Sequence, residues 1–374
     1  MRLAVLHVMR SPVGGLFRHV VDLAREQTAR GHRVGLVADA STGGARADAL
    51  LSSLAGELAL GVTRVAMSRE LGPSDWSAGR HVAQKLAALD VDLVHGHGSK
   101  GGAYARLVGG RALKVYTPHG GSLHYRRSTP VGFVYLGLER LLAARTDLFL
   151  FESAYGRDAF RAKVCEPRGL VRVVHNGVGP DEFEPVAHGE AAGAMTDLLF
   201  IGELRRLKGV DVLIEALAVL AEQGRRLTAT IVGAGPDGQA FQDLAAKRGL
   251  VGSILWPGPM PAREAFARGR LMVVPSRAES LPYVVLEAAA AGLPQIATAV
   301  GGLAEIFGTD AGLLVAPGDP AALAAAIANR LDDPAEANAL AVRLRERVRS
   351  GFSVAAMTDG VLTAYRDALA QRPR

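Results

Sequence analysis

Short apolar runs alternate with longer amphipathic segments along almost the whole chain. Apolar runs of this length are typical of buried strands, and the helical spacing between them is the pattern of βα units that build a parallel sheet. We therefore expect an α/β fold with doubly wound parallel sheets. The pattern predicts strands at residues 2–8, 32–38, 92–97, 113–119, 147–153 and 170–176, and again at 197–204, 228–235, 253–258, 271–276, 294–300 and 312–318.

One stretch interrupts the alternation, at residues 177–195, where Gly, Pro and acidic residues predict a linker. The 374 residues also exceed the usual size of one hydrophobic core. We expect two facing Rossmann-like domains, 1–180 and 190–350, with ligands bound in a cleft at the carboxyl ends of their strands. From residue 320 the spacing predicts one or two helices, and the segment 351–374 is expected to cross back to the first domain.

The composition indicates a reducing compartment. The single Cys165 cannot form an internal disulfide, and the apolar run at 2–9 is too short for a secretory leader and lacks its cleavage site. No apolar stretch reaches the roughly 20 residues of a membrane span, so a cytoplasmic protein is expected. The net charge of +6 suits an anionic partner, but the Arg and Lys residues are scattered and do not favour nucleic acid.

Three cations lie between a predicted strand and a helix that is expected to begin near Gly209; they are Arg205, Arg206 and Lys208. The amino end of a helix already carries positive partial charge, so cations are poorly placed there unless an anion joins them. A diphosphate would accept Lys208 as a point charge and one of the two arginines as a planar fork. Solvated surface charges are the alternative.

Two glutamates belong to the segment ESLPYVVLEAAAAGLP. Glu279 lies in the loop after a predicted strand, and Glu287 lies in a helix expected from about Pro282. A loop carboxylate can accept hydrogen bonds from sugar hydroxyls, while a helical one can reach a second polyol such as ribose. A general acid/base pair and ordinary surface glutamates are the alternatives.

The predicted first domain has glycine and histidine in loops that follow its strands. Gly14 and Gly15 let the backbone approach a ligand where a helix end offers NH groups to an anion, although a tight turn explains them equally well. Histidines occur at 95–102 and 117–125, and we expect His119 foremost to orient a substrate. No metal site is expected, because no third His or carboxylate follows at ligand spacing.

Two further features are expected to be structural. His7 and His32 are interpreted as hydrogen-bonded core residues.

The GAGPDG segment from Gly233 to Gly238 has the spacing of a dinucleotide-binding loop, but no acidic residue follows about 20 positions on, where a ribose ligand belongs. An NAD site is therefore not expected.

In their shared order these segments resemble the retaining glycosyltransferases of family 4, whose GT-B fold consists of two facing Rossmann-like domains. The most specific element is the spacing of Glu279 and Glu287 within residues 279–302. The resemblance spans nearly the whole chain. Its weaker elements are NGV at 176–178, TPHG at 117–120, KG at 208–209 and the closing helix around 352–365.

The resemblance implies transfer of a sugar from a UDP- or GDP-linked donor to an acceptor hydroxyl, with retention and without a cofactor or metal. It assigns the diphosphate to Lys208 with an arginine, and the ribose to Glu287. It assigns the transferred sugar to Glu279, the amides after it, and His119. The implied donor-binding residues are Gly14, Gly15, Arg205, Arg206, Lys208, Gly233, Met260, Glu279, Leu281, Tyr283, Val284 and Glu287, with His119, Lys208 and Glu279 as the catalytic group.

The sequence departs from the family pattern at three places. Glu203 stands where many members have Arg, Pro282 lacks an NH that could meet the sugar, and Gly179 replaces a common acidic residue. A nucleotide-sugar epimerase of the non-hydrolysing type, an NAD-dependent dehydrogenase and a non-catalytic sugar-binding protein are the alternative functions.

The apolar segment at 129–145 bears on the identity of the acceptor, because a membrane-binding helix here would indicate a lipid-linked acceptor. A buried core helix is predicted here, and a surface helix that binds an anionic bilayer is the alternative, because Arg126 and Arg127 precede it. In the second case the protein would make weak peripheral contact with the inner face of the membrane. The acceptor would then be lipid-linked, as in assembly of an exported polysaccharide or glycolipid.

Overall fold

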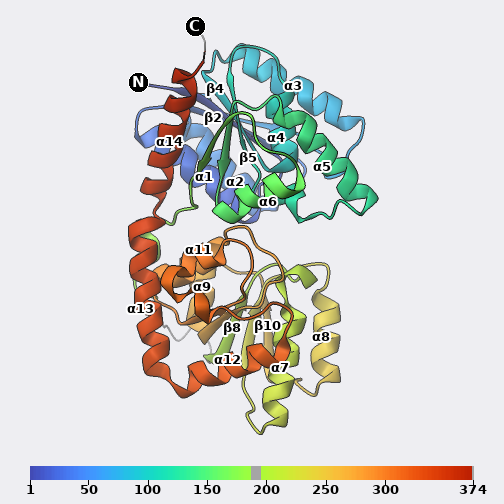
Figure 1. Ribbon diagram of the computed structural model, residues 1–374, viewed down its shortest axis with the longest axis vertical. Coiled ribbons are helices and arrows are strands. Elements are labelled where there is room, and N and C mark those ends of the chain that lie inside the picture. The colour runs from blue at the N-terminus through green and yellow to red at the C-terminus, as the bar shows by residue number, and fades with distance from the viewer. Residues whose placement is uncertain (187–194, 373–374) are drawn as a thin grey trace. The chain divides into compact units, whose positions relative to one another are not determined.

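The computed structural model describes residues 1–186 and 195–372. The chain divides into two compact units, the first formed by Met1–Gly177 with Val354–Arg374 and the second by Val178–Ser353. Within the predicted linker and the predicted final segment, residues 187–194 and 373–374 lie outside the described part of the chain. Each unit is built on its own parallel sheet with helices on both faces (Figure 1).

The first unit contains a seven-stranded sheet in the order β3-β2-β1-β4-β5-β6-β7, in which all neighbours run parallel. The order reverses between β1 and β4, which is the kind of place where α/β sheets bind ligands. The strands are β1 (Ala4–Met9), β2 (Arg33–Asp39), β3 (Val62–Val65), β4 (Leu93–His97), β5 (Leu113–Thr117), β6 (Leu148–Phe151) and β7 (Leu170–Val173). The helices are α1 (Gly14–Ala29), α2 (Gly44–Glu57), α3 (Ser74–Ala88), α4 (Gly98–Leu107), the 3₁₀ helix η1 (Gly121–His124), α5 (Pro130–Ala143), α6 (Ala154–Lys163) and α14 (Val354–Ala370).

Alternate side chains of these strands enter cores on opposite faces, as the period of a strand requires. Val5 and Leu93 pack in a cluster with α1 and α14, whereas Leu6 and Val94 pack in a cluster with α3 and α4. Tyr365 of α14 is fully buried in the first cluster. The last helix thus returns the chain to the first unit, as predicted.

The second unit repeats this plan with five parallel strands in the order β10-β9-β8-β11-β12, and its order reverses between β8 and β11. The strands are β8 (Thr196–Ile201), β9 (Ala229–Val232), β10 (Ile254–Gly258), β11 (Gly269–Val274) and β12 (Gln295–Ala297). The helices are α7 (Val210–Glu222), α8 (Gly238–Lys247), α9 (Ala262–Ala265), α10 (Tyr283–Ala290), α11 (Leu303–Phe307), α12 (Pro320–Asp332) and α13 (Pro334–Gly351). Short 3₁₀ helices are η2 (Pro180–Phe183), η4 (Arg206–Lys208), η5 (Phe266–Arg268) and η6 (Gly308–Leu313).

The predicted strands differ from the structure at two places. The strand predicted at 312–318 is wrong, because η6 takes up its start and only an isolated bridge between Thr298 and Val315 remains. The sequence pattern also misses β3, a short edge strand whose first three residues are only partly buried. Edge position and partial burial remove the continuous apolar run on which the prediction depended.

The end of the chain forms three helices, α12, α13 and α14, instead of one or two. Pro334 begins α13, and the carboxylate of Asp333 accepts a hydrogen bond from the backbone NH of Glu336 at 3.0 Å. A proline in the first turn behind an aspartate cap starts a new helix. The apolar spacing continues across this break and therefore does not reveal it.

Helix α5 is not the buried core helix that was predicted. One face does pack inward, with Leu136 and Ala143 in a core cluster. On the other face the side chains of Phe133 and Leu141 are 70% and 72% exposed. Among the described residues, no helix combines the length and apolarity needed to cross a bilayer. Helix α5 is therefore a half-buried helix with an apolar outer face.

Candidate functional site

Lys208 and Glu279 meet at the carboxyl edge of the second sheet. Lys208 lies in the loop after β8 and Glu279 in the loop after β11, so the two loops flank the reversal of strand order. The Lys208 Nζ lies 2.7 and 2.9 Å from the two oxygens of the Glu279 carboxylate. The Ser276 hydroxyl donates to the same carboxylate at 2.7 Å. Since the Lys208 side chain is 28% exposed and that of Glu279 only 9%, the pair presents a fixed ammonium group at this edge.

A second ion pair holds the backbone of the lysine loop. Arg277 binds Asp211 of α7 through two contacts of 2.7 Å and donates to the carbonyl of Arg206 at 2.7 Å. Gly209 has a φ of +73°, and a Cβ there would lie 1.9 Å from the carbonyl oxygen of Pro275. Only glycine allows this approach. The loops after β8 and β11 are thus fastened to each other at residues before and after Lys208 in the sequence.

The two candidate arginines are held differently. The guanidinium of Arg205 pairs with Glu203, the residue that departs from the family pattern, at 2.9 Å. Arg206 is exposed, and its backbone NH donates to the carboxylate of Asp237 at 2.7 Å. Among the ion pairs of the described residues, none involves the Arg206 guanidinium. Arg206 is therefore the better available second cation of this loop.

The glycines of the GAGPDG segment pack against the lysine loop. Gly233 has a φ of +146°, and a Cβ there would lie 1.9 Å from the carbonyl oxygen of Gly202. A Cβ on Gly235 would lie 2.4 Å from the carbonyl oxygen of Leu204. Close approach of two backbones accounts for this glycine spacing. The dehydrogenase alternative thereby loses the one sequence feature that favoured it.

The remaining predicted donor residues lie around α10. Glu287 is 8% exposed within this helix. Leu281 and Tyr283 are buried in a core cluster, and Val284 and Met260 pack against the same cluster with partial burial. The side chains of these last four residues are therefore used for packing.

In the first unit the predicted residues follow adjacent strands at the reversal of strand order. Gly14 and Gly15 begin α1 after β1, with Gly14 at a φ of +66°. His119 follows β5 and has a φ of +52°, a left-handed conformation that costs non-glycine residues free energy and is frequent at functional sites. Its Nε2 lies 3.1 Å from Nδ1 of His97, the last residue of β4.

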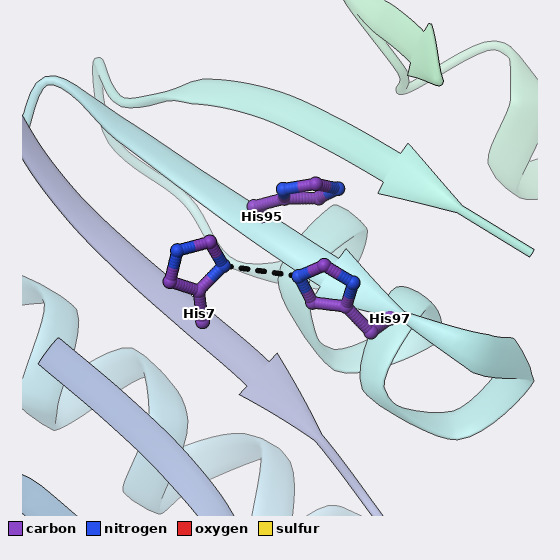
Figure 2. A group of neighbouring side chains, drawn as sticks. All are labelled: His7, His95 and His97. Atoms are coloured by element: carbon purple, nitrogen blue, oxygen red, sulfur yellow. Dashed lines mark hydrogen bonds between the residues drawn. The ribbon is translucent and has the colours of Figure 1, made fainter. Parts of the chain in front are cut away.

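His119 belongs to a histidine cluster on the sheet face covered by α1 and α14; its members are His7, His19, His95, His97 and His119. Figure 2 shows His7 and His97 joined through their ring nitrogens, 3.0 Å apart, with His95 beside them. Each outer member is bonded to another side chain, His7 to Gln27, His19 to Asn176 and His95 to Tyr365. The cluster is therefore tied to both covering helices.

Burial keeps this cluster neutral. Desolvation lowers the pKa of His119 to about 3 and the pKa of His7 to about 4. Desolvation first, and charge repulsion among the rings second, holds the pKa values of His19, His95 and His97 well below their ordinary value. At neutral pH each ring offers one NH donor and one lone pair.

The extent of the cluster is not evident from the sequence. Strands β1 and β4 pair with His7 opposite His95, and His97, two residues on, lies on the same face. Strand register would reveal these three, whereas His19 comes from α1 and only packing shows it. His32 accepts a hydrogen bond from the backbone NH of Leu3, which agrees with its predicted structural role.

Two family models match the chain. The model described as "Glycosyltransferase Family 4" matches residues 13–182, and the model described as "Glycosyl transferases group 1" matches residues 196–333. The first match contains His119, and the second contains Lys208 and Glu279. Both stretches thus belong to sugar-transferring enzymes.

Whole-chain similarity agrees with these matches. D-inositol 3-phosphate glycosyltransferase of Frankia alni is 30% identical over 399 residues, which cover 95% of each chain. D-inositol 3-phosphate glycosyltransferase 1 of Catenulispora acidiphila is 34% identical, over 62% of this chain and 60% of that protein. The crystal structure of Anabaena HepE in complex with UDP and glucose has a TM-score of 0.79 at 20% identity, over 98% of this chain and 100% of that one, which shows a common fold. The chain is therefore a transferase enzyme that belongs to glycosyltransferase family 4.

Proposed function

We propose that the protein transfers a sugar from a UDP- or GDP-linked donor to an acceptor hydroxyl with retention of the anomeric configuration. The observation that carries the proposal is the ion pair of Lys208 with Glu279, where the loops after β8 and β11 meet. A nucleoside-diphosphate sugar can interact with both the ammonium group and the carboxylate. Its phosphates attract the ammonium group, and its sugar hydroxyls donate to the carboxylate. The UDP bound by HepE supports a uridine donor.

Charge favours Lys208 and Arg206 as the groups that stabilise the leaving diphosphate. The Arg205 guanidinium is held by Glu203 of its own loop, whereas no ion pair among the described residues holds that of Arg206. As the bond from the anomeric carbon to the diphosphate breaks, negative charge grows on the leaving oxygen, and two fixed cations stabilise it in the way that Mg²⁺ does elsewhere. We assign NH contacts to the phosphates to Gly14 and Gly15, because they begin a helix.

The proposed reaction takes place on one face of the sugar. The acceptor oxygen attacks the anomeric carbon on the side from which the diphosphate leaves, and its proton passes to the departing phosphate oxygen. No protein nucleophile takes part, and Glu279 holds the transferred sugar. We assign a sugar hydroxyl to His119 and the ribose to Glu287, while the backbone around Leu281 to Val284 and at Met260 contacts the donor.

A donor screen tests this function. We expect one UDP- or GDP-sugar to raise the thermal unfolding midpoint and to be hydrolysed slowly in the presence of EDTA, with NADH giving no shift. The released sugar, followed by NMR, should first appear with the anomeric configuration of the donor. A shift with NADH and with none of the nucleotide sugars would favour the dehydrogenase, and a product of opposite configuration would contradict retention.

We further propose that the acceptor is lipid-linked and that α5 binds the surface of an anionic bilayer. The outer face of α5 forms the α5 patch, which consists of Val131, Phe133, Val134, Leu138 and Leu141, all exposed. The four arginines within residues 125–145 are exposed, and the one acidic residue in this range, Glu139, is buried and paired with Arg106. An apolar face bordered by uncompensated arginines fits anionic headgroups.

Introducing negative charge into the α5 patch tests this second proposal. The variant Phe133→Asp/Leu141→Asp is expected to lose at least about tenfold in affinity for vesicles that contain phosphatidylglycerol, because each added carboxylate opposes burial and repels the headgroups. The control Val342→Asp changes an exposed apolar residue of α13, 68% exposed, and should bind like the native protein in vesicle flotation at low salt. Equal binding by both variants, or no binding by the native protein, would refute the proposal.

A further inference from the structure

We propose that His19, His97 and His119 bind one Zn²⁺ ion in the first unit. Each of the three offers one ligand nitrogen, and these nitrogens lie within 4.8 Å of one another. Imidazole nitrogens are favoured ligands of Zn²⁺, and three histidines with an open fourth position form a common zinc site. The sequence predicts no metal site, because no third ligand follows the histidine segments at ligand spacing. In the folded structure His19 supplies this third ligand.

The separation of two of the nitrogens fits a shared ion. Nδ1 of His97 and Nε2 of His119 lie 3.1 Å apart. Two nitrogens bound to one Zn²⁺ in tetrahedral geometry are separated by about 3.3 Å, given the usual Zn–N distance. The ion can therefore replace the hydrogen bond between these rings after a change of about 0.2 Å in the separation of the two nitrogens, provided that both lone pairs turn toward the ion and the His119 proton moves from Nε2 to Nδ1.

A chain of hydrogen bonds orients the lone pair of His97. The amide oxygen of Gln27 can only accept, so His7 donates to it from Nε2, at 2.9 Å. Nδ1 of neutral His7 then accepts from Nε2 of His97, at 3.0 Å (Figure 2). The lone pair of His97 is thereby left on Nδ1, which faces His119. Outer hydrogen bonds of this kind commonly fix the orientation of metal-binding imidazoles.

Asn176 orients the ring of His19, because Nδ1 of His19 donates to its amide oxygen at 3.0 Å. The rings of His19 and His119 are 4.7 Å apart between centroids and meet edge to face. The backbone of His119 is left-handed, a conformation that costs a non-glycine residue free energy and that clusters at functional sites.

A second trio, His7, His95 and His97, also brings three nitrogens into reach, yet it fits an ion less well. His95 uses both of its nitrogens, for Tyr365 at 2.7 Å and Thr117 at 2.8 Å. All three rings of that trio are buried, whereas His119 is only partly buried and gives an ion a route from solvent. We therefore place the ion in the trio that contains His119.

Metal titration without donor or acceptor tests the site, so its outcome is independent of the proposed transfer reaction. We expect the EDTA-stripped protein to bind one Zn²⁺ per chain in competition with a chromophoric chelator, and Co²⁺ to give the visible absorption of a tetrahedral ion. His119→Ala and His19→Ala should each weaken binding at least about tenfold, in line with the effect of altering a metal shell. His81→Ala, on an exposed histidine of α3, is the matched control and should bind like the native protein.

Circular dichroism of each variant establishes that it is folded before titration, and His119 is the safer of the two ligand variants because it is partly buried in a loop. Native affinity no better than that of His119→Ala would overturn the proposal. Full binding by both His119→Ala and His19→Ala would overturn it as well, because the ion would then belong to the second trio or to another place.

Discussion

Replacing Lys208 by Ala is expected to lower kcat/KM for sugar transfer by about 10²- to 10³-fold, an effect of the size seen when one fixed group that stabilises transition-state charge is removed. The ammonium of Lys208 is fixed between the sheet edge and the Glu279 carboxylate, so it needs no reorganisation as the diphosphate leaves. The fall should be larger in kcat than in donor binding, since charge on the diphosphate is greatest in the transition state. Initial rates with the donor that the screen identifies measure it.

Two further variants separate this role from general effects of charge. Lys247→Ala removes an exposed lysine from the last turn of α8 in the same unit and should leave the rates unchanged. Lys208→Arg keeps the charge but changes the donor geometry, and it should recover only part of the activity. A Lys208→Ala enzyme as fast as Lys247→Ala would show that the leaving diphosphate is stabilised elsewhere.

The chain's periodicity predicts the strands that lie inside the sheets. Residues 4–9 form such a strand, because every one of them is buried and all except His7 are apolar. The pattern misses the edge strand at residues 62–65. It also wrongly predicts a strand over 312–318, where η6 takes up the first residues and only a single bridge joins Val315 to Thr298, just after β12. Apolar content reports burial, whereas pairing at a sheet edge depends on neighbours that the local sequence does not specify.

The candidate site also has features that the sequence predicts and features that only the folded structure shows. The loops that carry Lys208 and Glu279 are predictable, because both follow strands and carry unusual charge. The clamp of Arg277 on Asp211 is not predictable, because it joins two loops through packing and has no motif of its own. His19 joins the histidine cluster for a similar reason, since the docking of α1 on the sheet brings it there. Contacts that depend on how helices dock require the folded structure.

A buried carboxylate links the loop after His119 to the α5 patch. Glu139 of α5 accepts hydrogen bonds from Arg106 of α4 at 2.8 Å and from the Tyr116 hydroxyl at 2.7 Å. The Ser122 hydroxyl of η1 donates to it at 2.9 Å. The Arg106 guanidinium lies 3.7 Å from the centroid of the Tyr116 ring, and the side chains of Arg106 and Glu139 are 0% and 4% exposed. One carboxylate thus holds together α4, β5, η1 and α5.

Glu139→Ala is therefore expected to destabilise the first unit by about 3–5 kcal/mol, because it leaves a buried guanidinium without its counter-charge and two hydroxyls without their acceptor. Urea unfolding followed by circular dichroism measures the loss. Glu166→Ala is the matched control, because it breaks the ion pair of Glu166 with Arg161. The side chain of Arg161 is 40% exposed and that of Glu166 is 67% exposed. Exposed pairs of this kind contribute about 0–1 kcal/mol to stability.

The double variant Arg106→Met/Glu139→Leu distinguishes the cost of a stranded charge from the loss of a favourable pair. It removes both charges and fills similar volume, so it should recover most of the stability that Glu139→Ala loses. If the double variant is as unstable as the single one, the network stabilises the unit through its hydrogen bonds to Tyr116 and Ser122 and not through charge pairing. If Glu139→Ala costs no more than Glu166→Ala, the carboxylate does not hold these four elements together.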